Sequence, residues 1–225
     1  MSITAYYGKN GYYLEDHKNY LTDAVLHRDV DCIVKSLQLT KKDTCLDLQC
    51  AQGRITIELA KMGHLVDGVD NSEHMLSLAK AAAKKEHLDI TFIKEDVHRL
   101  KLSKQYSKVF IFFPEWTEVD LQKVVMNVSR VMKRGGLFLC DQDTLFRVWD
   151  YLKKHPKAPF SFDPVTMELR EEGEKVGNRY YTFPELQAIF QDAGLKIIKT
   201  YGGWSLSDGP YRFDSKRLRV IAKKM

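Results

Sequence analysis

Three aspartates occupy equivalent places in the first half of the chain. Asp47, Asp70 and Asp96 each lie at or directly after the end of a short apolar run, 23 and 26 residues apart. Each run has the length and composition of a buried strand. When such strands are parallel, their carboxyl ends meet at one edge of the sheet, where open α/β sheets bind ligands. We therefore expect the three carboxylates to face a common ligand.

Carboxylates placed in this way suit a polar, partly cationic adenosine ligand. An acid at the end of the second strand can accept both hydroxyl groups of a ribose, and one after the third strand can accept the adenine amino group. Asp47, beside a loop of small residues, would face an ammonium group. Each aspartate taken singly also fits a helix cap or a turn. A dinucleotide is disfavoured, because the loop lacks G-x-G-x-x-G spacing and Asp47 would repel a diphosphate.

Strands and helices are expected to alternate around these acids. The apolar spacing predicts strands at 44–48, 64–69, 90–94, 108–113 and 137–141, and helices at 22–37, 55–61, 72–83 and 119–132. Ser72 is the expected N-cap of the third helix. Short connections between the elements predict a parallel sheet with helices on both faces.

The end of the chain breaks this alternation. A helix is expected at 183–193, and the strands 196–201 and 218–223 are joined without room for a crossover helix, so they should pair antiparallel. The predicted fold class is therefore α/β, with a seven-stranded, mostly parallel sheet and a C-terminal antiparallel hairpin. We expect one domain over residues 1–225.

Several motifs together resemble the class I S-adenosylmethionine-dependent methyltransferases of the small bacterial type. Residues 47–54, D-L-Q-C-A-Q-G-R, resemble their D-x-G-x-G-x-G loop. Residues 66–76 look like their G-V-D-x-S-x-x-M-L motif, and 131–138 resemble the L-K-P-G-G turn before the fifth strand. Residues 179–186 and 214–223 are similar to endings common in this class. The resemblance implies the Rossmann-like methyltransferase fold, with S-adenosylmethionine as cofactor and S-adenosylhomocysteine as product.

The motifs and strand ends also indicate which residues hold this cofactor. They are Asp47, Gln49, Ala51, Gly53, Asp70, Asn71, Met75, Asp96, Val97 and Phe112. In the first loop, Gln49 and Ala51 replace two of the family's glycines, and Gly53 remains. Glycine permits positive φ, so a side chain is tolerated here if the backbone stays in an ordinary region. The similar D-L-C-A-A-P-G loop of the RNA cytosine methyltransferases implies that cofactor binding survives such replacements.

The acceptor side is expected beyond the fourth and fifth strands. Phe112, Phe113 and Trp116 either stack on an apolar or aromatic acceptor or fill the core. The N/D-P-P-Y motif of many amino-directed methyltransferases is absent. Asp141 and Asp143 are the candidate catalytic residues, which would accept a proton from the acceptor or fix its orientation. They could equally cap the next helix.

Two further segments are expected around the acceptor. Residues 145–182 resemble the insertion that helps to cover the acceptor in this family. Residues 1–40 are expected to form an N-terminal helical arm. Within it, four tyrosines either belong to a lid that excludes water from the site or pack as a fixed arm, namely Tyr6, Tyr7, Tyr12 and Tyr13.

Composition limits the remaining classes of function. The net charge of +5 is spread over separated lysine pairs, which is typical of a solvated surface and makes a nucleic-acid partner unlikely. No apolar run reaches the roughly 18 residues of a membrane span, and no secretory signal is recognisable. The four cysteines are scattered, without C-x-x-C spacing. We therefore expect a cytoplasmic protein with no disulfide, no metal and no membrane partner.

These observations predict an S-adenosylmethionine-dependent methyltransferase that acts on an oxygen or nitrogen of a small-molecule acceptor. An RNA or protein methyltransferase is the first alternative, and it would gather Lys and Arg on the rim of the acceptor cavity. The second alternative is a methyltransferase-like binding or regulatory protein whose altered loop no longer supports catalysis. Neither the acceptor nor the oligomeric state follows from these patterns.

Overall fold

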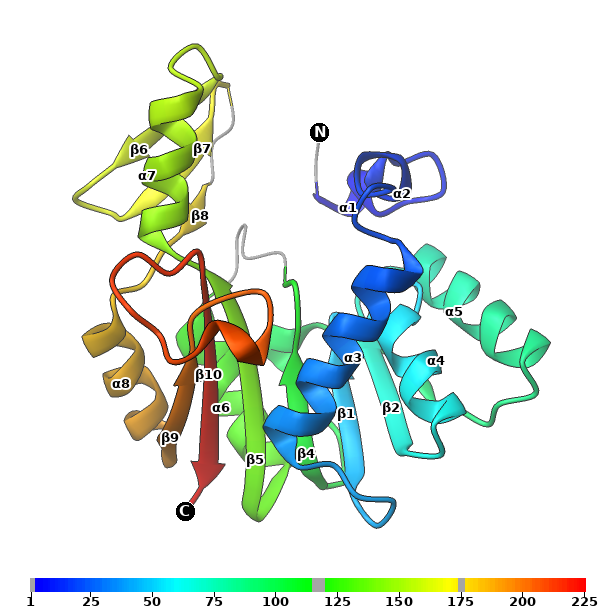
Figure 1. Cartoon of the computed structure of the whole chain (residues 1–225). Helices are drawn as coiled ribbons and strands as arrows, with labels where there is room; N and C mark the ends of the chain where they lie inside the picture. Colours follow the sequence, from blue (N-terminus) through cyan, green and yellow to red (C-terminus); the bar gives the residue numbers. More distant parts are fainter. Residues whose placement is uncertain (1–2, 115–119, 174–176) are drawn as a thin grey trace.

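A seven-stranded sheet forms the body of the protein (Figure 1). The computed structural model describes residues 3–114, 120–173 and 177–225. The strand order is β3-β2-β1-β4-β5-β10-β9. The strands are β1 (Thr44–Leu48), β2 (Leu65–Asp70), β3 (Phe92–Lys94), β4 (Tyr106–Ile111), β5 (Met132–Asp143), β9 (Leu195–Tyr201) and β10 (Arg217–Lys224). Neighbours among β1 to β5 pair in parallel, whereas β10 is antiparallel to β5 and β9. The predicted sheet with its C-terminal hairpin is confirmed.

The register brings the carboxyl ends of the central strands to one edge. Leu48 of β1 pairs with Val69 of β2 and with Ile111 of β4. Asp70 of β2 pairs with Lys94 at the end of β3. The loops that follow these strands therefore meet along one edge of the sheet.

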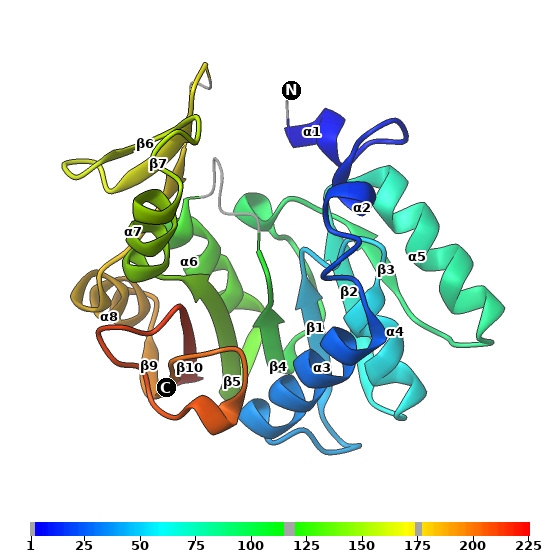
Figure 2. The same cartoon turned by 45° about the horizontal axis from the view of Figure 1, so that its top comes forward.

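Helices cover both faces of the sheet (Figures 1 and 2). One face carries α3 (Asp23–Leu37), α4 (Arg54–Lys61) and α5 (Glu73–Lys85), and the other carries α6 (Leu121–Val131) and α8 (Phe183–Asp192). Alternation along β4 separates the two cores, because Phe110 packs with α3 whereas Val109 packs with α6. As predicted, Ser72 caps α5, and its Oγ accepts a hydrogen bond from the Met75 backbone N at 3.2 Å.

Two additions rise above the carboxyl edge on opposite sides (Figures 1 and 2). The arm contains the short helices α1 (Ile3–Tyr6) and α2 (Tyr13–Asp16). The insertion contains α7 (Leu145–Lys154) and a three-stranded antiparallel sheet of β6 (Phe160–Asp163), β7 (Glu168–Glu171) and β8 (Asn178–Arg179). A helix directly after the fifth strand was expected only as the one that Asp141 or Asp143 could cap. None of the insertion's strands was predicted, because strands of two to four residues are too short for a visible alternation.

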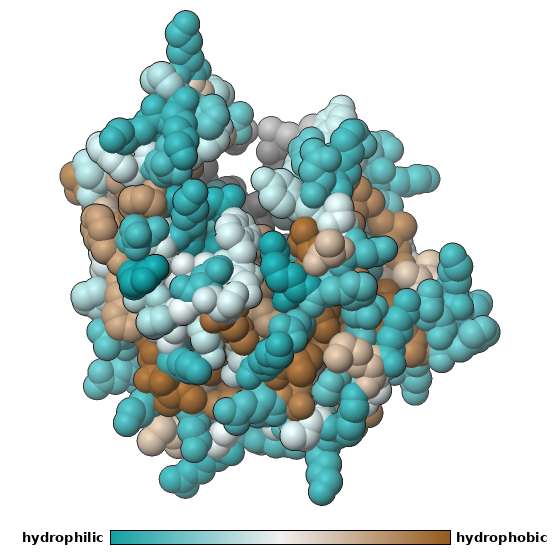
Figure 3. All heavy atoms as spheres, viewed as in Figure 1, coloured by the Kyte–Doolittle hydropathy of each residue, from teal (hydrophilic) through white to brown (hydrophobic). Residues whose placement is uncertain are grey.

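The surface is mixed in polarity and is hollowed between the insertion and the arm (Figure 3). No helix within the described ranges is long and apolar enough to cross a membrane. The described residues contain no group of three or more His, Cys, Asp or Glu side chains arranged to hold a metal ion. All four cysteines are buried free thiols.

Candidate functional site

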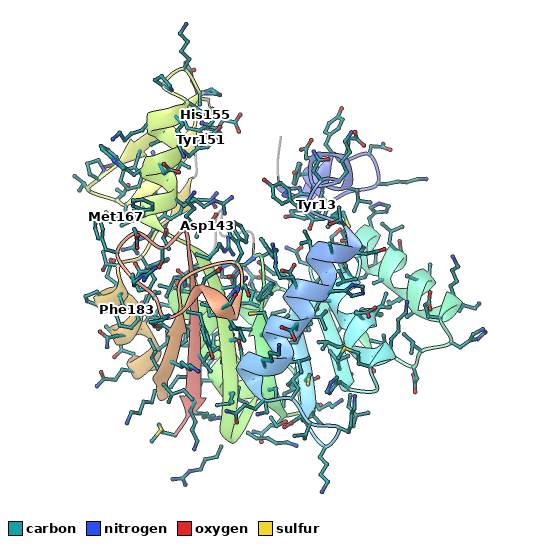
Figure 4. The ribbon with its side chains drawn as sticks, in the orientation of Figure 1. Tyr13, Asp143, Tyr151, His155, Met167 and Phe183 are labelled. Carbon is teal, nitrogen blue, oxygen red and sulfur yellow. The ribbon has the colours of Figure 1, made fainter. Side chains whose placement is uncertain are left out.

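Two cavities adjoin at the carboxyl edge of the sheet. The inner cavity, of about 140 Å³, is lined by residues of three strand ends: Gln49, Ala51, Asp70, Asn71, Ser72, Glu95 and Val97. The outer cavity, of about 260 Å³, is lined by residues of the arm, α4, the insertion and β10. Tyr7, Tyr13 and Phe113 line both cavities and form the boundary between them. Tyr13 and Asp143 lie on opposite sides of the opening (Figure 4).

Asp70 is the central acid of the inner cavity. Its Oδ2 accepts a hydrogen bond from the Ala51 backbone N at 2.9 Å, and its Oδ1 accepts one from the Ser72 backbone N at 2.8 Å. Burial raises the pKa of Asp70, against the effect of these backbone donors. Each carboxylate oxygen keeps a lone pair for a further donor. The carboxylate can therefore accept two ligand hydroxyl groups, which is the role that the sequence predicts for it.

The loop before α4 holds two non-glycine residues in the left-handed region. The φ angle is +57° at Gln49 and +47° at Ala51, close to the +76° of Gly53. The condition stated for tolerating a side chain here, an ordinary backbone conformation, is therefore not met. The loop keeps a glycine-like conformation, which costs a residue with a Cβ about 1–2 kcal/mol. Strain of this kind clusters at binding sites, where the surrounding structure maintains it.

Ala51→Gly is expected to increase the free energy of unfolding by up to about 1 kcal/mol, because glycine adopts this φ without strain. Denaturant unfolding measures the change. Ala81→Gly is the matched control. Ala81 is exposed within α5, where the same replacement should reduce stability by about 1 kcal/mol. An equal loss in both variants would show that Ala51 is not strained.

Asp47 lies behind the loop and outside the lining of the inner cavity. Its Oδ2 accepts a hydrogen bond from Thr56 Oγ1 at 2.6 Å. Burial raises the pKa of Asp47 to about 7, and the charge of Asp70 acts in the same direction. The Thr56 hydrogen bond and the Arg54 charge oppose that rise. Asp47 therefore places a titratable carboxyl directly beneath the strained loop.

This pKa has a consequence for stability. A carboxyl whose pKa is higher in the folded than in the unfolded protein stabilises the fold while it is protonated. For Asp47 this contribution is present below about pH 4 and is lost as pH rises to about 7. Asp47→Asn stays neutral, so it should gain about 4 kcal/mol over the wild type between pH 4 and pH 8. Urea unfolding of both proteins checks this, and parallel pH curves would contradict it.

The third strand end differs from the sequence prediction in one residue. Asp96 Oδ1 accepts hydrogen bonds from the backbone N and the ring Nδ1 of His98, both at 2.9 Å, and caps the short helix η1 (Val97–Arg99). Asp96 is outside the lining, whereas Glu95 and Val97 are in it. In this structure Asp96 is a helix cap, which is the other role that the sequence allowed for each aspartate. Glu95 supplies the carboxylate here, and its only signal in the sequence was its place beside Asp96.

The other residues predicted to bind the cofactor form two groups, those that line the inner cavity and those that lie outside its lining. Gln49, Ala51, Asn71 and Val97 line the inner cavity, and Gly53, Met75 and Phe112 do not. Gly53 permits a close approach of the loop to the neighbouring helix and strand, because a Cβ there would lie 3.0 Å from Ala79 Cβ and 3.1 Å from the Phe92 ring. Met75 and Phe112 are buried. Gly53 therefore supports the loop, whereas Met75 and Phe112 belong to the buried interior.

The arm is tied to the cap of α5. Ser72 Oγ donates a hydrogen bond to the Tyr7 backbone O at 2.9 Å. The Tyr7 and Tyr13 rings pack with centroids 4.7 Å apart and line both cavities. Tyr6 contacts both rings and donates to Asp16 Oδ2 at 3.0 Å, but it lines neither cavity. The arm thus borders the site through Tyr7 and Tyr13.

Phe113 shapes the wall between the cavities. Its φ is +52°, unusual for an aromatic residue, and its backbone N donates to Asp141 Oδ2 at 3.1 Å. Its ring stacks on Trp204 with centroids 5.7 Å apart. Phe113 is therefore a lining residue as well as a packing residue. Trp116, its predicted companion, lies outside the described residues.

A buried ion network lies beneath the outer cavity. Asp141 is fully buried, forms an ion pair with Arg217, and accepts from Arg219 Nε at 3.3 Å. Asp143 forms ion pairs with Arg147 and Arg217 and lines the cavity. Of the two candidate catalytic residues, the structure therefore brings only Asp143 into the lining.

The capping role that the sequence allowed for these two acids is wrong. Thr144 is the N-cap of α7, and its Oγ1 accepts a hydrogen bond from the Arg147 backbone N at 3.2 Å. A hydroxyl one residue beyond Asp143 thus satisfies the free N–H group at the start of the helix.

Sequence reasoning missed the cationic lining of the outer cavity. Arg217 and Arg219 alternate with apolar residues on β10, and Asp141 and Asp143 have the same spacing on β5. The two pairs of residues are in register, Arg217 with Asp143 and Arg219 with Asp141. Charges at alternate positions of buried strands were the available signal. Trp204, from the connection between β9 and β10, carried no comparable signal.

Comparison with known proteins is consistent with these features. The family described as "Methyltransferase domain" matches residues 45–136. A putative methyltransferase of Geobacillus sp. (strain WCH70) is 30% identical over 107 residues, which is 46% of this chain and 43% of that protein. The ubiquinone biosynthesis O-methyltransferase of Coxiella burnetii is 31% identical over 159 residues, 70% of this chain and 65% of that protein. The chain thus spans less than two thirds of the length of either relative.

The fold has close counterparts among solved structures. The crystal structure of an S-adenosylmethionine-dependent methyltransferase from Clostridium acetobutylicum aligns with a TM-score of 0.74 and 18% identity. The alignment covers 94% of this chain and 98% of that one. At this level of identity the likeness concerns the fold.

Proposed function

We propose that this chain, whose residues 45–136 match the methyltransferase-domain family and whose fold is that of a solved S-adenosylmethionine-dependent methyltransferase, is a class I S-adenosylmethionine-dependent methyltransferase that transfers a methyl group to an oxygen or nitrogen of a small molecule. The observation that carries the proposal is the pair of adjoining cavities. One is lined by the carboxylates of Asp70 and Glu95, and the other opens beside it across Tyr7, Tyr13 and Phe113. A cofactor and an acceptor can therefore meet at the shared wall.

The inner cavity fits the cofactor's adenosine. Asp70 has lone pairs for two ribose hydroxyls, Glu95 has a carboxylate for a further donor, and Val97 adds an apolar surface. When bound, S-adenosylmethionine supplies a methyl group on a sulfonium ion; the sulfur keeps the electron pair of the broken S–C bond, and the acceptor loses a proton as its new bond to carbon forms. Asp47, behind the loop, offsets the cofactor's positive charge.

The chain's own part is alignment and exclusion of water. Phe113 and the two arm tyrosines lie where the cavities meet and orient the acceptor against the inner cavity. Asp143 and His17 are candidate proton acceptors in the outer lining. His17 Nδ1 lies 3.1 Å from the Tyr13 backbone O. A carbonyl can only accept, so a neutral His17 ring has its proton on Nδ1 and a free lone pair on Nε2.

The arm and the insertion act as covers of the site. Tyr7, Tyr13 and His17 of the arm, with Asn178 and Tyr180 of the insertion, contribute to the outer lining. Closure of these parts excludes water from the reacting atoms. A cavity of about 260 Å³, enclosed from two sides, favours a small acceptor over RNA or a folded protein. The relative from Coxiella burnetii, named as an O-methyltransferase, supports oxygen as the acceptor atom.

Incubation with methyl-labelled S-adenosylmethionine and a small-molecule metabolite extract tests the proposal. We expect S-adenosylhomocysteine and a labelled small product by mass spectrometry, both dependent on the protein. Label in added RNA or protein instead would favour the macromolecular alternative. Calorimetry that detects no binding of S-adenosylmethionine or S-adenosylhomocysteine would overturn the proposal and favour a regulatory protein.

A further inference from the structure

The outer cavity has a strongly cationic lining. Guanidinium groups of Arg54, Arg147, Arg179 and Arg217 reach it from four separate elements: α4, α7, β8 and β10. Among the described residues of the lining, Asp143 is the sole carboxylate. Arginines that converge from distant parts of a chain are costly to bring together unless their charge is neutralised.

The neighbouring carboxylates do not neutralise this charge completely. The ion pairs are Asp29 with Arg28 and Arg54, Asp141 with Arg217 and Arg219, Asp143 with Arg147 and Arg217, and Glu185 with Arg179. Six guanidinium groups thus share four carboxylates, which leaves an excess of two positive charges within the described parts of the chain.

Arg54 has a donor that these partners leave unused. Its Nη2 lies 3.2 Å from Asp29 Oδ2, but its Nη1 is buried and has no hydrogen-bond partner among the described residues. The side chain is 19% exposed and borders the cavity. A buried donor without a partner costs about 1–3 kcal/mol. A small rotation of the Arg54 side chain toward a ligand oxygen in the cavity would supply the missing partner and remove that cost.

Trp204 holds the cationic lining in place and gives it a flat wall. The guanidinium groups of Arg28, Arg147 and Arg217 lie 5.5, 5.2 and 5.2 Å from the centre of its ring. Phe113 stacks on the same indole, and the Arg217 guanidinium also lies 4.8 Å from the centre of the Phe113 ring. Such contacts fix the guanidinium groups and leave their edges for hydrogen bonds.

We propose that the methyl acceptor is a small oxyanion, bearing a carboxylate or phosphate group, which the arginines of the outer cavity bind. This inference rests on the proposed function. Arg54 and Arg147 are the principal contacts, because Arg217 already has two carboxylate partners. Guanidinium groups bind both carboxylate and phosphate in a bidentate manner. The anion would thereby direct the rest of the acceptor toward Phe113 and the inner cavity.

Anion-exchange separation of a metabolite extract tests the proposal. The anionic and the non-anionic fractions are each incubated with the full chain and methyl-labelled S-adenosylmethionine. We expect at least tenfold more labelled small product from the anionic fraction. Phosphatase treatment of that fraction distinguishes a phosphate from a carboxylate, since it removes only a phosphorylated acceptor. Label mainly in the non-anionic fraction would overturn the proposal while leaving the methyltransferase function intact.

Two matched variants of α7 test whether the outer cavity is responsible for the labelling of an anionic acceptor. Arg147→Gln should reduce labelling at least tenfold and leave S-adenosylhomocysteine affinity within twofold of the wild type. Lys153→Gln removes a positive charge from the same helix, outside the lining, and should change neither. Equal labelling by the two variants would overturn the proposal. No labelling of either fraction by a protein that binds S-adenosylhomocysteine would also overturn it.

Arg54→Gln separates two sources of the bound oxyanion, because the amino-acid end of the cofactor also carries a carboxylate. We expect its S-adenosylhomocysteine affinity to stay within threefold of the wild type and its labelling of the anionic fraction to fall at least tenfold. A tenfold loss of S-adenosylhomocysteine affinity with normal labelling at saturating cofactor would instead assign Arg54 to the cofactor and overturn its role toward the acceptor.

Discussion

Asp70→Ala is expected to weaken S-adenosylhomocysteine binding about 100-fold. The variant removes the acceptor for two ribose hydroxyls, and the loss of two such charge-assisted hydrogen bonds corresponds to about 3 kcal/mol. It also removes the bridge from the Ala51 backbone N to the Ser72 backbone N, so the strained loop loses its anchor. Isothermal titration calorimetry measures the change directly.

Two further variants separate binding from folding. Asp70→Asn keeps one acceptor oxygen and should retain an intermediate affinity, whereas Asp89→Ala removes an exposed carboxylate elsewhere and should bind normally. Thermal unfolding without ligand shows whether each protein is folded. A folded Asp70→Ala protein with an affinity within threefold of the wild type would contradict the assigned role of Asp70.

Asp141→Ala is expected to decrease the free energy of unfolding by about 3–5 kcal/mol, because it leaves buried guanidinium groups without their partner. Arg219 pairs with Asp141 through its Nε, and its Nη1 and Nη2 have no hydrogen-bond partner among the described residues. Arg217 retains Asp143. Denaturant unfolding measures the loss.

The double variant Asp141→Ala with Arg219→Met tests whether the two charges act as a pair. Removal of both should cost much less than the sum of the two single replacements, since no buried charge is then left unpaired. Additive losses would contradict the pairing. A stable Asp141→Ala protein that binds S-adenosylhomocysteine but has lost methyl transfer would instead favour the catalytic role that the sequence allowed for Asp141.

The sheet and most of the inner cavity follow from patterns along the chain. The strand predicted at 44–48 is β1 residue for residue, and the expected cap at Ser72 is present. Both depend on local properties, namely a short buried run and the N–H groups at the start of a helix. Asp70 was predictable because the end of a parallel strand determines where its carboxylate lies. That Glu95 lines the cavity while Asp96 caps η1 could not be read from the sequence, because neighbouring residues of one turn look alike.

For the insertion and the arm, the sequence predicted where each segment lies in the chain but not the short helices and strands within it. Four-residue helices such as α1 and α2 and the short strands β6 to β8 lack the length at which periodicity becomes a signal. The conformation of Gln49 and Ala51 was also not determined by the sequence pattern. Residue type favours an ordinary φ at both positions, but the hydrogen bond from the Ala51 backbone N to Asp70 and the packing around Gly53 hold the loop in the left-handed region.

The sequence alone predicted the order of strands and helices and pointed to Asp47 and Asp70, because strand ends, caps and apolar periodicity are properties of contiguous residues. The acceptor side became visible only in the folded protein. Arg54, Arg147 and Arg217 lie on elements far apart along the chain, and only the fold brings them to one cavity, where Arg147 and Arg217 lie against Trp204. The net charge of the cavity lining depends in turn on which carboxylates lie beside these arginines. A site assembled from single residues of many elements has no local pattern, so the cofactor could be inferred before the structure, and the anionic character of the acceptor could not.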